Sequence, residues 1–125
     1  MLALDYGSAR TGVAVSDPTG SVARPLCVVE RAGTEAGLER LRELVHEEAA
    51  ERVVVGLPLT LRGTRGEQAR ETERFIEGLR AAVEVPVETF DERFTTTLAG
   101  PGPGDDARAA AHLLSSYLEW SSRRS

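Results

Sequence analysis

The sequence has no lysine, a single cysteine, few aromatic residues and only short apolar runs. The lone Cys27 cannot form an internal disulfide, which is typical of a reducing cytoplasm, and we expect a cytoplasmic protein. No apolar run approaches the roughly 18 residues that a membrane-spanning helix needs. Residues 1–7 also lack the basic and apolar regions of a signal peptide. A membrane partner is therefore not expected.

A basic surplus is absent as well. The 125 residues include 15 basic ones, all arginine, and 20 acidic ones, so the formal net charge is −5. Proteins that hold nucleic acid by electrostatics alone are usually basic, so a nucleic-acid function would have to depend on a local site. The length and the hydrophobic content of 41% are typical of one globular domain spanning residues 1–125.

Hydrophobic patterning predicts a mixed α/β fold. Apolar strands are expected at residues 2–6, 11–16, 22–30, 52–56 and 85–90. Amphipathic helices are expected from Thr34 to Ala49, over 66–82, and from Asp105 or Asp106 onward, with a frayed tail at 121–125. Pro86 indicates an edge position for the last strand. This order predicts five strands in one sheet, three antiparallel and then two parallel, with helices on both faces.

Acidic residues occur where two strands end and where the last helix begins. Asp5 ends the first strand, Asp91 and Glu92 end the last strand, and Asp105 and Asp106 open the last helix. The ends of parallel strands meet at one edge of a sheet, where ligands bind. Clustered carboxylates repel one another unless a cation is bound, and oxygen ligands suit Mg²⁺ or Mn²⁺. Two such ions can activate water and stabilise the leaving oxygen of a phosphodiester.

The same residues also have simpler explanations. An aspartate before glycine is common in turns, and an aspartate at a helix start commonly serves as the N-cap. The segment from Asp5 to Gly12 also fits a phosphate-binding hairpin of the actin and sugar-kinase type, although those folds need two such domains and a longer chain. Spacing alone leaves these interpretations open.

Several segments resemble one known family. Residues 4–17, Leu-Asp-Tyr-Gly-Ser-Ala-Arg-Thr-Gly-Val-Ala-Val-Ser-Asp, resemble the opening motif of the YqgF (RuvX) family. Further matches follow in the same order at 23–26, 54–59, 63–64, 91–96 and 106–118. The family is described as Holliday-junction resolvases and as nucleases that process the 5′ end of precursor 16S ribosomal RNA. The resemblance implies an RNase H-like fold and a metal-dependent phosphodiesterase.

The resemblance also implies roles for individual residues. The catalytic residues would be Asp5, Glu92 and Asp106. The ligands of two Mg²⁺ or Mn²⁺ ions would come from Asp5, Asp91, Glu92 and Asp106. The middle carboxylate is either Asp91 or Glu92, and the longer side chain favours Glu92.

Substrate-binding roles are assigned to Arg10, Arg62, Gly63, Arg93 and Thr96. The two arginines that flank the carboxylates, Arg10 and Arg93, would hold phosphate oxygens or form ion pairs with those carboxylates. Gly63 would touch substrate or supply a positive φ, and Thr96 would bind phosphate or cap a helix turn. Tyr6 would stack on a base or pack locally.

One departure from the family concerns basic residues. No basic residue lies between Arg93 and Arg108, where relatives carry a Lys/Arg-rich segment, so a weaker grip on the phosphate backbone is expected. The favoured function is a nuclease for the 5′ end of precursor 16S ribosomal RNA. The alternatives are a resolvase of four-way DNA and a non-catalytic RNA-binding or ribosome assembly module. The expected partners are nucleic acid and ribosomal precursor particles, and the expected state is a monomer or weak homodimer.

Overall fold

The computed structural model describes residues 1–7, 9–17, 19–57, 66–91 and 106–124. Apolar runs form its strands, and segments with a helical period form its helices. The elements are β1 (Leu2–Asp5), β2 (Arg10–Ser16), β3 (Ala23–Glu30), α1 (Glu35–Glu47), β4 (Val53–Leu57), α2 (Glu67–Ala82), β5 (Val87–Asp91) and α3 (Asp106–Arg124).

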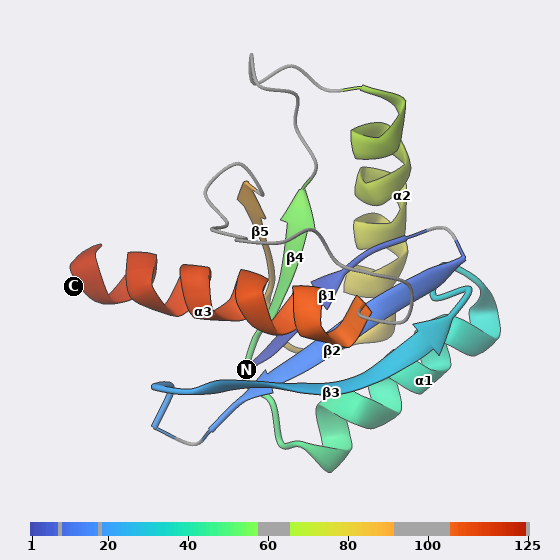
Figure 1. Ribbon diagram of the computed structural model, residues 1–125. Coiled ribbons are helices and arrows are strands. Elements are labelled where there is room, and N and C mark those ends of the chain that lie inside the picture. The colour runs from blue at the N-terminus through green and yellow to red at the C-terminus, as the bar shows by residue number, and fades with distance from the viewer. Residues whose placement is uncertain (8, 18, 58–65, 92–105, 125) are drawn as a thin grey trace.

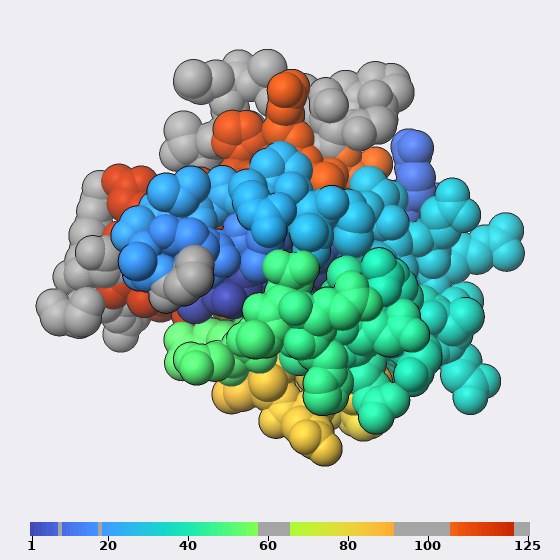
Figure 2. Space-filling model, turned by 90° about the horizontal axis from the view of Figure 1, so that it is seen from below, coloured from blue at the N-terminus to red at the C-terminus, as the bar shows by residue number. Residues whose placement is uncertain are grey.

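The strands form one mixed sheet in the order β3-β2-β1-β4-β5. The pairs β1–β2 and β2–β3 are antiparallel, whereas β1–β4 and β4–β5 are parallel. In Figure 1, α3 crosses one face of this sheet, and α1 and α2 lie behind the other. Figure 2 shows the same layers from below, with α3 in orange, β3 in blue, α1 in green and α2 in yellow. The predicted sheet and its flanking helices are confirmed.

Side-chain alternation along the strands divides the core between the two faces. On one face, leucines and valines of the sheet pack against α1 and α2; this core includes Leu2, Leu4, Val13, Val55, Leu41, Leu44, Phe75, Ile76 and Leu79. On the other face, smaller residues receive α3; this core consists of Ala3, Ala14, Val54, Phe90, Ala110, Leu113, Leu114 and Tyr117. The small side chains of Ala3 and Ala14 let α3 lie close to the central strands.

The start of α1 agrees with the sequence pattern, whereas its buried face differs in part. Thr34 Oγ1 accepts a hydrogen bond of 3.1 Å from the backbone N–H of Gly37, which is the predicted N-cap. The helix buries Leu41 and Leu44. The amphipathic helix was predicted to extend to Ala49, but Ala49 follows the helix with a φ of 50° and is exposed.

β5 and α3 differ from the predicted elements in where β5 begins and where α3 ends. β5 is an edge strand, as Pro86 indicated, but it begins at Val87 and not at residue 85. The predicted fraying of 121–125 is wrong through Arg124, because α3 continues to that residue. Aromatic rings pack α3 against β5. The ring centroid of Phe90 lies 5.6 Å from that of Tyr117 and 5.7 Å from that of Trp120. None of the helices within the described ranges is long and apolar enough to cross a membrane.

Candidate active site

The parallel strands β1, β4 and β5 end at the same edge of the sheet, and the arrowheads of β4 and β5 point to the top in Figure 1. Asp5 is the last residue of β1, and Asp91 is the last residue of β5, where it pairs with Leu57 of β4. Both residues are half-buried. The carboxyl ends of parallel strands are where α/β sheets bind ligands, so this edge is the candidate site.

Strand register places Asp5 on the face that α3 covers. Asp5 pairs with Gly12 across β1 and β2, and Ala3 pairs with Ala14. Both alanines pack against α3. Because side chains repeat their direction every second residue, Asp5 lies on the same face as Ala3.

The first turn of α3 brings Asp106 to this position. Gly12 faces the start of the helix so closely that a Cβ there would overlap the carbonyl group of Asp106 and lie 2.8 Å from the nitrogen of Ala107. Only glycine allows this approach of helix backbone to strand backbone. Gly12 is also the strand partner of Asp5. The docking of α3 on Gly12 therefore holds Asp106 next to the end of β1.

Arg10 lies beside the same carboxylate. It precedes Gly12 by two residues on β2 and therefore shares its face. Its Nε atom is 3.6 Å from Asp106 Oδ2, and the two side chains are 51% and 30% exposed. That distance permits an ion pair but is too long for a hydrogen bond. The ion-pair interpretation of Arg10 is thus the one present in this structure.

The Oδ2 atom of Asp106 is buried and has no hydrogen-bond partner among the described residues. A buried carboxylate oxygen without a donor is energetically costly, and a bound cation removes that cost. Asp5 and Asp106 offer only oxygen atoms, the donor type that Mg²⁺ and Mn²⁺ prefer. The residues present therefore fit a divalent cation.

Asp91 differs from Asp5 in the face it occupies. On β5, Val87 packs with α1 and α2, whereas Phe90 packs with α3. Asp91 shares the face of Val87 by alternation, which is opposite to the face of Asp5. The structure therefore brings Asp106 to Asp5 but does not bring Asp91 to the same face.

The other predicted site residues, Arg62, Gly63, Glu92, Arg93 and Thr96, lie outside the described residues. Within the described part of the chain, no group of three His, Cys, Asp or Glu side chains is arranged to hold a metal ion. Asp5 and Asp106 are thus the described carboxylates of the site, and a third ligand remains a prediction for Glu92.

Tyr6, which follows Asp5, is directed to α2. Its ring stacks on Phe75 with a centroid distance of 4.4 Å, and its hydroxyl donates a 3.2 Å hydrogen bond to Glu71. Burial, followed by the bond to Glu71, raises the pKa of Tyr6. Of its two predicted roles, local packing is the one seen in the structure. Tyr6 therefore ties the end of β1 to α2.

Sequence reasoning missed two residues that shape the site. Gly12 sets the docking of α3, and the signal available for it was a glycine inside an apolar strand. Thr11 is fully buried, and its hydroxyl makes 3.4 Å hydrogen bonds with the backbone N–H and carbonyl of Gly7. It thereby closes the turn between Asp5 and Arg10.

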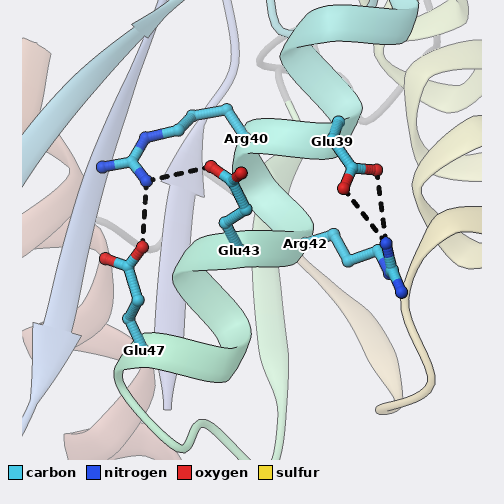
Figure 3. A network of polar contacts seen from close by, with 5 residues as sticks. All are labelled: Glu39, Arg40, Arg42, Glu43 and Glu47. Atoms are coloured by element: carbon cyan, nitrogen blue, oxygen red, sulfur yellow. Dashed lines mark hydrogen bonds and ion pairs between the residues drawn. The ribbon is translucent and has the colours of Figure 1, made fainter.

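Part of the acidic surplus lies away from this site, on α1. Arg40 contacts Glu47 at 3.1 Å and Glu43 at 3.3 Å, and Arg42 contacts Glu39 at 3.1 Å, all on the exposed side of the helix (Figure 3). Because α1 covers the face opposite to α3, these glutamates do not surround Asp5 and Asp106. The net charge of the chain therefore does not describe the charge of the candidate site.

The chain is similar to proteins named as nucleases and to a family described as resolvases. Residues 1–102 match the family described as "RuvX: Holliday junction resolvase". A protein of Chloroflexus aurantiacus named "Putative pre-16S rRNA nuclease" is 42% identical over 131 aligned positions, which cover 95% of this chain and 86% of that protein. A protein of the same name from Syntrophomonas wolfei is 35% identical and covers 95% and 93% of the two chains.

A solved structure agrees in fold. T. thermophilus RuvC in complex with a Holliday junction substrate superposes with a TM-score of 0.67, over 100% of this chain and 97% of that chain. The sequence identity is 19%, so this likeness shows a shared fold. The predicted RNase H-like mixed sheet is confirmed.

Proposed function

This chain belongs to the RuvX family, and we propose that it is a metal-dependent nuclease, acting as a single domain over residues 1–125, that hydrolyses phosphodiester bonds in precursor 16S ribosomal RNA. The relatives from Chloroflexus aurantiacus and Syntrophomonas wolfei, which align with almost the whole chain, support this substrate by their names. The unpaired Cys27 supports a cytoplasmic location.

One observation carries the metal-dependent chemistry. The docking of α3 on Gly12 places Asp106 beside the strand end that carries Asp5, and Asp106 Oδ2 is buried there without a hydrogen-bond partner among the described residues. Such a carboxylate pair on a strand end and a helix start is held on rigid backbone. We therefore assign Asp5 and Asp106 as ligands of divalent cations, Mg²⁺ or Mn²⁺.

The middle ligand is assigned to Glu92. Asp91 lies on the face of α1 and α2, opposite to Asp5, which argues against Asp91 as the middle ligand. This supports Glu92 over Asp91. Bound divalent cations supply the positive charge that activates water and stabilises the leaving oxygen.

The remaining residues of the site bind and orient the RNA. Arg10 is half exposed at the same edge and can reach a phosphate oxygen. By resemblance to the family, we also assign substrate binding to Arg93, Arg62, Gly63 and Thr96. The acidic face of α1 lies on the opposite side of the sheet, so substrate binding is confined to the edge and to the side of α3.

RNA is favoured over a four-way DNA junction. Cutting one RNA strand needs one site, whereas symmetrical resolution of a junction needs two, as in a dimer. We therefore propose a monomer or weak homodimer that acts on ribosomal precursor particles, since cleavage of one RNA strand needs no second site. The family description names the junction as a substrate, so both substrates belong in the test.

The test compares cleavage of an RNA that carries the 5′ end of precursor 16S ribosomal RNA with cleavage of a four-way DNA junction, in Mg²⁺ and in EDTA. We expect Mg²⁺-dependent cleavage of the RNA and a loss of at least about 100-fold in Asp5→Asn and Asp106→Asn, since each removes a ligand charge. Glu47→Gln is the matched control, because it changes a carboxylate on the exposed side of α1. Wild-type rates in both aspartate variants would exclude the mechanism, and cleavage of the junction alone would exclude the RNA substrate.

A further inference from the structure

The geometry points to Arg10 as an exchangeable counter-ion of the metal site. Before cations bind, its guanidinium offsets the negative charge of Asp106; when a cation binds, Arg10 leaves Asp106 and holds a phosphate of the substrate. This inference rests on the proposed function, because it takes Asp106 as a metal ligand. It adds that Arg10 and the cation compete for the same carboxylate.

The contact between Arg10 and Asp106 is incomplete. The Nε–Oδ2 distance is 3.6 Å, and Oδ2 still has no hydrogen-bond donor among the described residues. The surface pair Arg40–Glu47 reaches 3.1 Å with a hydrogen bond, as Figure 3 shows. Arg10 therefore places a positive charge beside Asp106 but does not donate a hydrogen bond to its buried Oδ2 atom. A contact of this kind is easily exchanged for a better ligand.

The two partners differ in their freedom to move. Asp106 is fixed, because the backbone at the start of α3 lies directly against Gly12. Arg10 is the first residue of β2, and its side chain is 51% exposed on a long flexible stem. A divalent cation bound to Asp106 would repel the guanidinium, so Arg10 is the partner that moves.

Arg10 remains at the edge of the sheet after it leaves Asp106. Its cross-strand neighbour on β3 is Glu30, which is exposed. Arginine binds phosphate oxygens in a two-pronged geometry, and a phosphate positioned for hydrolysis must lie next to the carboxylates. The same side chain can therefore neutralise Asp106 in one state and bind the substrate in the other.

The first experiment measures Mn²⁺ binding by isothermal titration calorimetry, without nucleic acid. Arg10→Gln should bind Mn²⁺ about three- to fivefold more tightly than wild type, the scale of a partly exposed ion pair. Arg24→Gln is the matched control, because Arg24 is 62% exposed and makes a comparable 3.8 Å pair with Glu48 on another part of the surface; its affinity should not change. Equal or weaker Mn²⁺ binding by Arg10→Gln would overturn the inference, since a purely structural clamp predicts that result.

Further variants separate this inference from the proposed function. Asp106→Asn should lose Mn²⁺ binding; if it binds like wild type, the metal site itself is wrong. If Arg10→Gln does not fold by circular dichroism, Arg10→Lys replaces it, and the weaker lysine contact should still give tighter Mn²⁺ binding than wild type. Mn²⁺ binding no tighter than that of wild type would then overturn the competition.

The second experiment measures binding of a short fluorescent RNA with Ca²⁺ and with EDTA. With Ca²⁺, Arg10→Gln should bind the RNA several-fold more weakly, and its salt dependence should fall by about 0.7 in slope, the value for one phosphate contact on a single strand. With EDTA, the two proteins should bind alike, since Arg10 is then engaged by Asp106. An equal loss in both conditions would overturn the exchange.

Discussion

Gly12 and Asp106 touch through their backbones, so that a side chain at Gly12 would overlap the carbonyl group of Asp106. This contact joins the strand partner of Asp5 to the first turn of α3. One glycine thus sets the relative position of two carboxylates that come from distant parts of the sequence. Its consequences for stability and for the site can be measured.

The variant Gly12→Ala should be strongly destabilised. The added Cβ forces α3 away from β2, and overpacking of this kind typically costs about 1–3 kcal/mol. Unfolding in urea, followed by circular dichroism, measures the change. Gly78→Ala on α2 is the control, since its Cβ would meet only the end of the Leu38 side chain at 3.4 Å and alanine favours a helix. Equal stability of Gly12→Ala and wild type would mean that the close approach does not exist in solution.

Divalent cations should stabilise the folded protein. At ten times the dissociation constant, Mn²⁺ bound only to the folded state contributes about 1.4 kcal/mol, which raises Tm by about 5 °C. Asp106→Asn should show no such rise, because the variant lacks the carboxylate that we propose as a ligand of the cation. Differential scanning fluorimetry with Mn²⁺ and with EDTA tests this, with Glu47→Gln expected to behave like wild type. A rise in Asp106→Asn equal to that of wild type would place the cation elsewhere.

Tyr117 should make stability depend on pH in the alkaline range. Its hydroxyl donates to Glu88 and accepts a 3.3 Å hydrogen bond from Arg52, and burial followed by the bond to Glu88 raises its pKa. A raised pKa means that the unfolded state loses its proton first. The raised pKa therefore adds to the free energy of unfolding. This contribution is full below pH about 10 and is lost as the pH rises through the pKa of Tyr117 in the folded state.

Tyr117→Phe measures that contribution. The variant should be about 1 kcal/mol less stable at pH 7, because it lacks the hydroxyl bonds. The difference in the free energy of unfolding between wild type and variant should narrow above pH about 10, where the contribution of the Tyr117 hydroxyl is lost. Urea unfolding between neutral and alkaline pH gives both values, and Trp120→Phe serves as an aromatic control that keeps the Tyr117 hydroxyl. A gap that stays constant with pH would contradict the raised pKa.

Cys27 should react slowly in the folded protein. Burial raises the pKa of its thiol, and the thiolate is the reactive form. Modification by a thiol-reactive disulfide reagent at pH 7 should therefore be much slower than that of free cysteine, and unfolding in urea should remove the difference. Cys27 is half-buried, and rapid reaction of the folded protein would show that this burial does not raise the pKa of its thiol.

Much of the fold was predictable because its elements have strong local signals. The uniformly apolar run Val53–Val55 indicated a strand inside a parallel sheet, and Thr34 indicated the start of α1. Pro86 correctly indicated an edge strand. These signals come from side-chain preferences within a few residues, which a single sequence contains.

The features that local signals missed depend on tertiary contacts. The extent of α3 follows from aromatic packing of Tyr117 and Trp120 on Phe90 of β5. The burial of Leu44 instead of Ala49 follows from where α1 ends. The length of α3 thus depends on a residue that is distant in sequence, and the buried face of α1 depends on the exact end of the helix.

The candidate site was likewise predictable only in part. Asp5 and Asp106 were predictable as strand-end and helix-start carboxylates, and the structure brings their elements together through Gly12. The face of Asp91 was not predictable, because it depends on which β5 residues pack against α3, as Phe90 does, and which pack against α1 and α2, as Val87 does. Glu92 lies outside the described residues and stays a prediction.

The order of synthesis has a consequence for the site. Asp5 is synthesised before Asp106, because β1 precedes β5 and α3 in the chain. Until α3 docks, the sheet face formed by Ala3, Ala14 and Val54 has no cover and Asp5 has no Asp106 beside it. Under the proposed mechanism, a chain whose α3 has not docked lacks the complete carboxylate pair, so nuclease activity should appear only when α3 docks on Gly12.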